Sequence, residues 1–189
     1  MKYIPILELP ILIIMVLIRS AMLRRQGTKV IVFGTTDKTD YIIVPIVVLF
    51  FYGILSTISD LPFPAILKTL YWTTTAQYIC AIAVCTASLM WFAITLKTFG
   101  TSFRVGIDEK TLDKLITNGT FSICRNPIYV AFITFFIGIF VAYPSIVTTV
   151  FLIIVPITIH RQILREEAFL KTHYGAEYEE YYKKVRRYL

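Results

Sequence analysis

The run of residues 128–159, IYVAFITFFIGIFVAYPSIVTTVFLIIVPITI, contains no charged side chain and decides how this chain is expected to fold. As one straight helix it would be about 48 Å long, well beyond the roughly 30 Å hydrocarbon core of a bilayer. Pro144, in a Tyr-Pro-Ser turn, divides it into residues 128–143 and 145–159. The run therefore predicts two short membrane-spanning helices in a tight hairpin, whose open ends lie side by side at one membrane face.

The whole chain has the composition of a membrane protein. Of its 189 residues, 57% are hydrophobic and only 16% are charged, whereas soluble domains are about 45–50% apolar and about 25% charged. Three further apolar runs are suitable for spanning helices, and they cover residues 3–18, 41–59 and 69–96. We therefore expect an all-α membrane protein with about five transmembrane helices, forming a single integral membrane domain over residues 1–189.

The basic residues predict which face of the membrane each segment occupies. All of the 19 Lys and Arg residues except Lys2 and Lys68 follow the first, third or fifth expected span. Because Lys and Arg concentrate in cytosolic loops, the N-terminus is expected outside and the C-terminus in the cytosol. Residues 97–127 and 160–189, including C-terminal helices, would then be cytosolic. The net charge of +7 is explained by this topology, so we expect no nucleic-acid partner.

Several familiar kinds of catalytic centre have no counterpart in the sequence. There is no phosphate-binding glycine loop, and the two histidines, His160 and His173, are too few for a histidine-rich metal site. The three cysteines show no metal-ligand spacing, so no metal is expected. What remains is a polar cluster where the hairpin opens. There Pro127 is suited to the first turn of a helix, and Glu166 and Glu167 lie on the extension of the second span.

Four motifs that occur in order around this cluster resemble one family. They are LITNGTF (Leu115–Phe121), RNPIYVA (Arg125–Ala131), REEAFL (Arg165–Leu170) and YGAEYEEYYKKV (Tyr174–Val185). Together they look like the isoprenylcysteine carboxyl methyltransferase family and its prokaryotic relatives, over roughly Phe103 to Tyr188. The family pattern Arg-His-Pro-x-Tyr-x-Gly differs here, because Asn126 replaces the histidine and Ala131 the glycine, and Phe121 stands where a tyrosine is usual. Asn126 can donate and accept hydrogen bonds but carries no charge.

The resemblance implies methyl transfer from S-adenosylmethionine, with S-adenosylhomocysteine as product, at the cytosolic face of a prokaryotic cell membrane. A glutamate suits the cofactor's ammonium or ribose hydroxyls, and aromatic faces attract its sulfonium. The residues implied to bind the cofactor are Lys114, Leu115, Ile116, Phe121, Asn126, Pro127, Ile128, Tyr129, Glu166 and Glu167. The arginines that are candidates for holding a substrate carboxylate are Arg161, Arg165 and Arg104.

The methyl acceptor is expected to be lipid-like and to enter sideways from the bilayer, with membrane lipids as neighbours. By resemblance it is the carboxylate of a prenylated cysteine, which is already an anion at neutral pH and needs no general base. The alternative is the amine of a phospholipid or other small lipophilic molecule, which must first lose a proton. A different class of function is also open: a non-enzymatic membrane protein whose basic face binds anionic lipid.

Two smaller features also lead to expectations. The tyrosines near the C-terminus favour an aromatic belt at the membrane interface; they are Tyr174, Tyr178, Tyr181, Tyr182 and Tyr188. Glu8, in the first apolar run, is expected to extend its carboxylate to the outer interface.

Overall fold

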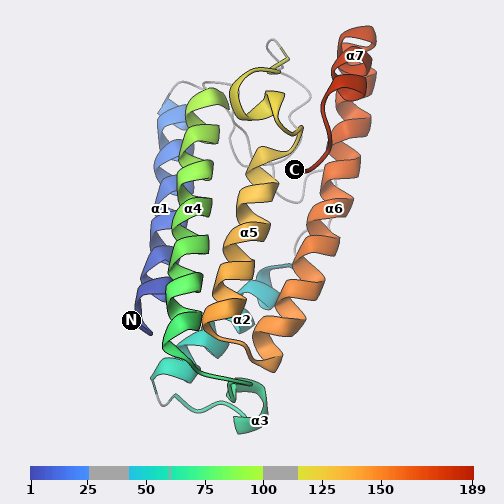
Figure 1. Cartoon of the computed structure of the whole chain (residues 1–189). Coiled ribbons are helices and arrows are strands. Elements are labelled where there is room, and N and C mark those ends of the chain that lie inside the picture. Colours follow the sequence, from blue (N-terminus) through green and yellow to red (C-terminus); the bar gives the residue numbers. More distant parts are fainter. Residues whose placement is uncertain (26–42, 60, 100–114) are drawn as a thin grey trace.

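The computed structural model describes residues 1–25, 43–59, 61–99 and 115–189 (Figure 1). Within these ranges the chain is helical, and the one β feature is an isolated bridge between Cys124 and Arg186. The elements are α1 (Ile4–Arg25), α2 (Ile43–Ile58), α3 (Ala65–Lys68), α4 (Thr75–Phe99), the 3-10 helix η3 (Gly119–Ser122), α5 (Pro127–Ala142), α6 (Ile146–Tyr174) and α7 (Ala176–Lys184). The predicted all-α class is confirmed.

Among the described residues, three helices are long and apolar enough to cross a bilayer. They are α4, α6 and the Ile4–Met22 part of α1, whereas the apolar helices Pro45–Ile58 and Pro127–Ala142 are shorter. Helix α6 continues well past the end of the fifth expected span, to Tyr174. At 29 residues it is roughly 43 Å long, so its last turns extend beyond a hydrocarbon core of about 30 Å. The number of spans stays a prediction.

Helices α5 and α6 form the expected hairpin, which is closed by hydrogen bonds at the turn. Ser145 and Thr148 form a reciprocal capping box at the start of α6. The side-chain amide of Gln77 on α4 donates to the carbonyl of Ala142, the last residue of α5, at 3.0 Å. Since a helix end in a membrane has no water to satisfy its carbonyls, this bond allows α5 to end inside the bundle.

Helix α5 packs closely against α4. A methyl group added at Gly138 would overlap the sulfur of Cys85, so only glycine permits this approach. Nearer the start of α5, the Ser88 hydroxyl donates to the carbonyl of Ala131 at 2.6 Å. Small residues and interhelical hydrogen bonds are the usual means by which helices associate in membranes. One buried apolar cluster joins side chains of α1, α2, α4, α5 and α6.

Glu8 does not reach the interface as the sequence led us to expect. Its residue surface is only 8% exposed, and its Oε1 accepts a hydrogen bond from the Thr86 hydroxyl of α4 at 2.7 Å. Because α1 packs against α4, the threonine is a polar partner for Oε1, whereas Oε2 is buried without a hydrogen-bond partner among the described residues. The expectation was therefore wrong for a reason that lies in helix pairing.

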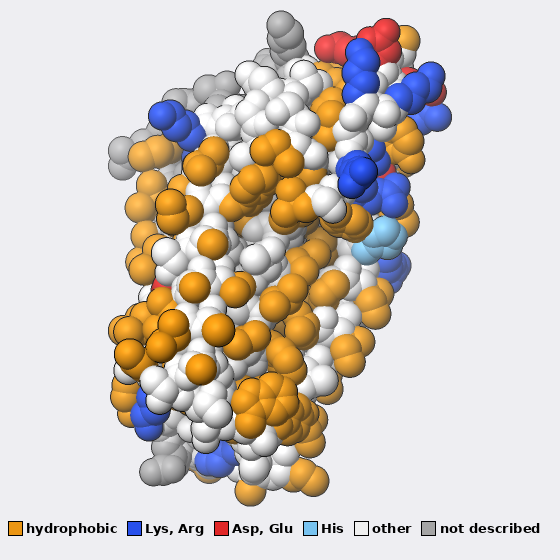
Figure 2. All heavy atoms as spheres, viewed as in Figure 1, with side chains coloured by type: hydrophobic (Ala, Val, Ile, Leu, Met, Phe, Trp, Pro, Cys, Tyr) orange, Lys and Arg blue, Asp and Glu red, His pale blue; other side chains and the backbone are white. Residues whose placement is uncertain are grey.

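The two ends of the bundle differ in what they carry. The N-terminus and α3 lie at one end, while η3, α7 and the C-terminus lie at the other, which we call the site end (Figure 1). Figure 2 shows Lys and Arg side chains gathered over α7 and the adjoining part of the site end, above a largely hydrophobic flank.

Candidate functional site

The start of α5 is anchored to α4. Pro127 occupies the first turn of the helix, as the sequence predicts, and Asn126 is the N-cap residue. The indole Nε1 of Trp91, on α4, donates to the carbonyl of Pro127 at 3.0 Å. Before it, η3 begins at Gly119, whose φ of +56° lies in the left-handed region that favours glycine. These contacts bring the segment of residues 119–127 to the site end.

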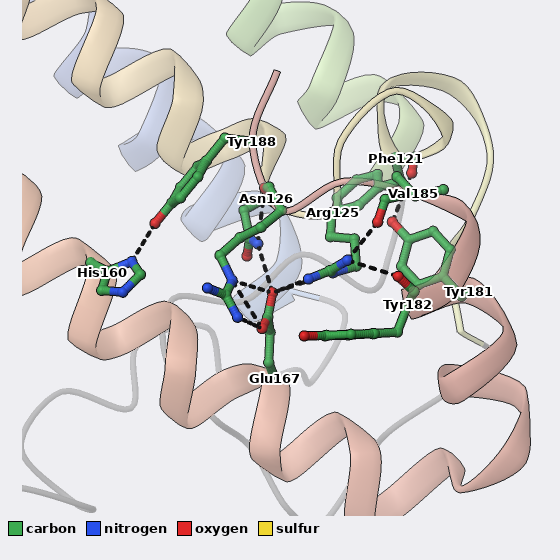
Figure 3. Close-up of polar contacts among 10 residues, drawn as sticks. Phe121, Arg125, Asn126, His160, Glu167, Tyr181, Tyr182, Val185 and Tyr188 are labelled. Carbon is green, nitrogen blue, oxygen red and sulfur yellow. Dashed lines mark hydrogen bonds and ion pairs between the residues drawn. The ribbon is translucent and has the colours of Figure 1, made fainter.

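Glu167 lies at the centre of the site. Its Oε1 accepts from Arg125 Nη2 at 3.0 Å, and its Oε2 accepts from Arg187 Nη2 at 2.8 Å. The amide of Asn126 adds a longer contact of 3.4 Å to Oε1 (Figure 3). Two arginines already compensate this carboxylate. An uncharged amide at position 126 therefore fits, because an imidazolium would add a third positive charge.

The two carboxyl groups of the Glu pair respond differently to their surroundings. Both follow the first 20 residues of α6 and so lie beyond the part of that helix that a bilayer core would cover. Burial acts to raise the pKa of Glu167, but hydrogen bonds and charges from Arg187 and Arg125 hold that pKa below its usual value. Burial raises the pKa of Glu166 despite hydrogen bonds from the Tyr129 hydroxyl at 2.6 Å and Gln162 Nε2 at 3.0 Å.

Arg125 is held in place from several directions. Its Nη1 donates to the backbone carbonyls of Tyr182, at 3.0 Å, and of Val185. The guanidinium lies over the Tyr182 ring, 4.0 Å from the ring centre, which adds a cation–π contact. With its side chain only 6% exposed, Arg125 is a buried bridge between the start of α5, α6 and the end of α7.

The C-terminal segment, Val185–Leu189, returns between α5 and α6 (Figures 1 and 3). The Arg125 amide donates to the carbonyl of Arg186 at 2.8 Å, and Asn126 Nδ2 contacts the carbonyl of Arg187 at 3.3 Å. The Tyr188 hydroxyl is hydrogen-bonded to His160 Nδ1 at 2.7 Å. Sequence reasoning missed this segment, because it interpreted the basic residues as topological and the tyrosines as a belt.

The expected interfacial belt is wrong for the tyrosines that pack into the site. Tyr178 and Tyr181 are 2% and 7% exposed, and the Tyr181 hydroxyl donates to the carbonyl of Phe121 at 2.7 Å. Burial, together with the negative charge of Glu167, raises the pKa of Tyr178 to about 12, although Arg125 acts in the opposite direction. Spacing in α7 does not separate them from the others, because Tyr182 lies four residues after Tyr178 on the same face of the helix and is 46% exposed.

The remaining residues that the sequence predicts for the site differ in burial, and two of them are not described. Phe121 is buried and stacks on Phe99 with 4.9 Å between ring centres. Leu115, Ile116 and Ile128 are partly buried. Two of the candidate residues, Lys114 and Arg104, lie outside the described residues.

A groove runs beside the polar cluster, between α5, α6 and the C-terminal segment. The groove is largely open, its volume is about 630 Å³, and its walls are mainly apolar. Arg161, one of the three candidate arginines, lines it and is exposed to solvent, whereas Arg165 lies further along α6 and is partly buried. The other side chains that line the groove are Val130, Ile133, Thr134, Pro156, Ile157, His160, Tyr188 and Leu189. Among the described residues, no group of three or more His, Cys, Asp or Glu is placed to hold a metal ion.

Comparison with known proteins identifies the family. A family model described as phospholipid methyltransferase matches residues 71–177, which is more than half of the chain. The chain belongs to the phospholipid methyltransferase family. This family is part of the isoprenylcysteine carboxyl methyltransferase superfamily of integral membrane methyltransferases, so the resemblance inferred from the four motifs is confirmed. No curated protein and no solved structure matches the chain.

Membership of the phospholipid methyltransferase family indicates an enzyme that transfers methyl groups. Together with the three long apolar helices, it points to an integral membrane protein. The matched residues include α4, α5, α6 and the Glu pair, but end before the C-terminal segment. Arg187 and Tyr188 are therefore contributions to the site that come from outside the matched region.

Proposed function

We propose that this protein transfers a methyl group from S-adenosylmethionine to a lipid-like acceptor that reaches the site from the bilayer. The observation that carries the proposal is the junction between the polar cluster and the apolar groove. Arg187 of the C-terminal segment bonds to Glu167, and the next residue, Tyr188, lines the groove. A water-soluble donor and a membrane-borne acceptor can thus bind on the two sides of one short segment.

The polar cluster has groups that suit the cofactor. Thr120 Oγ1, beside Phe121, is one of several buried polar atoms of the described residues that have no hydrogen-bond partner, so a bond to a ligand would displace no existing partner. The residues that we assign to hold the cofactor are Leu115, Ile116, Phe121, Asn126, Pro127, Ile128, Tyr129, Glu166 and Glu167, while Lys114, outside the described residues, stays an expectation. The bound cofactor would supply a methyl group activated by a sulfonium.

A cofactor ammonium at Glu167 would have to compete with an arginine. Arg187 is the partner more able to yield, because its side chain is 28% exposed whereas that of Arg125 is 6% exposed. A displaced Arg187 side chain can be solvated, while a displaced Arg125 would leave a buried charge without its counterion. We therefore assign Arg125 to hold Glu167 in position and Arg187 to exchange with the ligand.

Two acceptors are supported. The first is the amine of a phospholipid, in agreement with the description of the family. The second is the carboxylate of a prenylated cysteine, which the four sequence motifs imply. Arg161, exposed at the groove, can pair with either the phosphate of the first or the carboxylate of the second. In both cases the residues of the site align the reactants and exclude water around them.

We place the site end in the cytosol. Arg125, between η3 and α5, and the basic residues of α7 and the C-terminal segment lie there, whereas Lys2 precedes α1 and Lys68 ends α3 at the opposite end (Figure 1). The excess of Lys and Arg on cytosolic segments supports this orientation. By resemblance, the host is a prokaryotic cell membrane.

Calorimetry with S-adenosylhomocysteine on the purified protein in detergent tests the cofactor assignment. We expect binding by the wild type and weaker binding by Glu167→Ala and Tyr129→Phe. Lys171→Ala is the matched control, because it removes only the exposed Lys171–Glu179 pair further along α6 and α7. Absence of binding by the wild type, or equal binding by all four proteins, would refute the proposal.

Radiolabelled methyl transfer then identifies the acceptor. The assay compares vesicles that contain phosphatidylethanolamine with a soluble prenylcysteine analogue. Transfer to the amine should decline as the pH falls, because the protonated amine has no lone pair to attack with. Transfer to the carboxylate should persist in mild acid, down to about pH 3.5, where a terminal carboxyl group takes up its proton.

A further inference from the structure

The sequence offers only two histidines, and one of them lies in the groove. His160 is on α6 and lines the groove together with Arg161 and Tyr188. Its Nδ1 is 2.7 Å from the Tyr188 hydroxyl, as Figure 3 shows. This contact fixes one nitrogen of the ring and leaves Nε2 for a ligand. Imidazole is the side chain best suited to accept and release a proton near neutral pH.

The position of this pair relates it to both reactants. Tyr188 follows Arg187, which bonds to Glu167 in the polar cluster, so His160 is one hydrogen bond away from the segment that closes the cofactor side. On its other side, His160 adjoins the apolar walls of the groove, where an acyl chain fits. A headgroup amine whose chain lay in the groove would therefore be near both His160 and the polar cluster.

We infer that His160 is the proton acceptor for a lipid amine, and that Tyr188 is the residue that positions its ring. The inference rests on the methyl transfer proposed above and deepens it, because it assigns the deprotonation that an amine acceptor requires. The role requires the tautomer in which Nδ1–H donates to the Tyr188 oxygen, because Nε2 is then the basic nitrogen. General acid–base catalysis by a positioned side chain contributes about 10²- to 10⁴-fold in rate.

The step balances in atoms and charge. One N–H bond of the lipid ammonium breaks, and its proton binds to Nε2 of His160, which becomes an imidazolium. The freed nitrogen lone pair forms a bond to the methyl carbon as the carbon–sulfur bond breaks, and that electron pair remains on sulfur. A methylated ammonium and S-adenosylhomocysteine result, and the imidazolium returns its proton to water after the products leave.

The surroundings of His160 suit this role. From α6 itself, Arg161 is adjacent, and from the C-terminal segment Tyr188 faces the ring. The residues that α5 contributes to the groove are uncharged: Val130, Ile133 and Thr134. Burial raises the pKa of Tyr188, with Glu167 adding to the rise and Arg187 opposing it, so the hydroxyl stays protonated. A phosphate paired with Arg161 would sit beside the amine that His160 deprotonates.

The test compares three variants in methyl transfer to phosphatidylethanolamine vesicles. His160→Ala should reduce kcat/KM on the order of 100-fold, and added imidazole should restore part of the lost rate by occupying the space that the side chain leaves. Tyr188→Phe, which keeps the ring but loses the hydroxyl, should show a smaller loss that imidazole does not restore. His173→Ala is the control, because His173 is exposed and lies further along α6; it should behave as wild type.

Two binding measurements separate this inference from the proposed function. S-adenosylhomocysteine should bind His160→Ala and wild type with equal affinity, which also shows that the variant is folded. In ¹⁵N-histidine spectra, the His160 signals, assigned by comparison with His173→Ala, should shift with phosphatidylethanolamine bicelles and not with phosphatidylcholine, whose headgroup has no proton to give.

The possible results distinguish failure of the His160 inference from failure of the proposed methyl transfer. Full amine methylation by His160→Ala, no rescue by imidazole, an unmoved His160 signal, or transfer to a carboxylate alone would overturn the inference while the proposed methyl transfer stands. Failure of the wild type to bind S-adenosylhomocysteine would overturn the proposed function, and the inference with it.

Discussion

Removing the carboxylate of Glu167 should be among the most damaging single changes at the site end. Glu167 is 7% exposed and accepts from Arg125, Arg187 and Asn126. In Glu167→Ala, Arg125 would keep its positive charge with a side chain that is only 6% exposed. Breaking one side of a buried ion pair costs about 3–5 kcal/mol.

Removing Arg187, the more exposed partner of Glu167, should reduce the free energy of unfolding by less. Arg187→Ala leaves Glu167 paired with Arg125, and the Arg187 side chain is 28% exposed, so less desolvated charge is left behind. We expect a loss of about 1–3 kcal/mol, the range for a buried acceptor that loses one hydrogen-bond partner. The measurement is thermal unfolding in detergent, where the loss for Glu167→Ala corresponds to a fall in Tm of roughly 6–20 °C for a chain of this size.

An exposed ion pair provides the control for this comparison. Lys171 and Glu179 are 3.1 Å apart with side chains that are 64% and 49% exposed, so Lys171→Ala should change stability by at most about 1 kcal/mol. The expected order of losses is Glu167→Ala, then Arg187→Ala, then Lys171→Ala. A Glu167→Ala protein no less stable than Arg187→Ala would refute the reasoning, since the buried Arg125 would then carry no penalty.

Three further predictions concern pH, helix packing and the buried carboxyl of α1. Because folding lowers the pKa of Glu167, its stabilisation is present above about pH 4.3, the unfolded value, and is lost as the pH falls through the folded pKa; melting curves of wild type and Glu167→Gln should converge in acid. Gly138→Ala should lower stability by about 1–3 kcal/mol by overlap with Cys85, and adding Cys85→Ala should restore part of it; a single variant as stable as wild type contradicts the close contact. Glu8→Ala should cost about 0.5–1.5 kcal/mol, the net contribution of one hydrogen bond, because Thr86, whose hydroxyl loses its partner, is exposed, and Glu8→Gln should cost less; equal losses would show that this hydrogen bond contributes nothing.

The parts of the fold that could be predicted depend on local chemistry. Pro144 divides an uncharged run that is too long for one membrane span, so the run predicts a hairpin. The hairpin then brings residues 125–129 near residues 166–167. Pro127 begins α5 as expected, and Gly175, with φ of +53°, separates α6 from α7. The Glu pair and Tyr129 are neighbours for the same reason, so that part of the candidate site could be found without coordinates.

The contribution of the C-terminal segment could not be found in this way, because it depends on the direction in which the chain runs after α6 ends. Gly175 marks where α6 ends, but the sequence does not state which way α7 turns, and a tail of tyrosines and basic residues has the same local preference on a membrane surface as between two helices. Only when α7 turns back do Arg187 and Tyr188 meet Glu167 and His160. The local pattern thus predicts the acidic half of the site, the Glu pair. The tertiary fold adds the arginine partner, Arg187, to it. The fold also places His160 in the groove, whereas the local sequence would assign this histidine to the membrane interface.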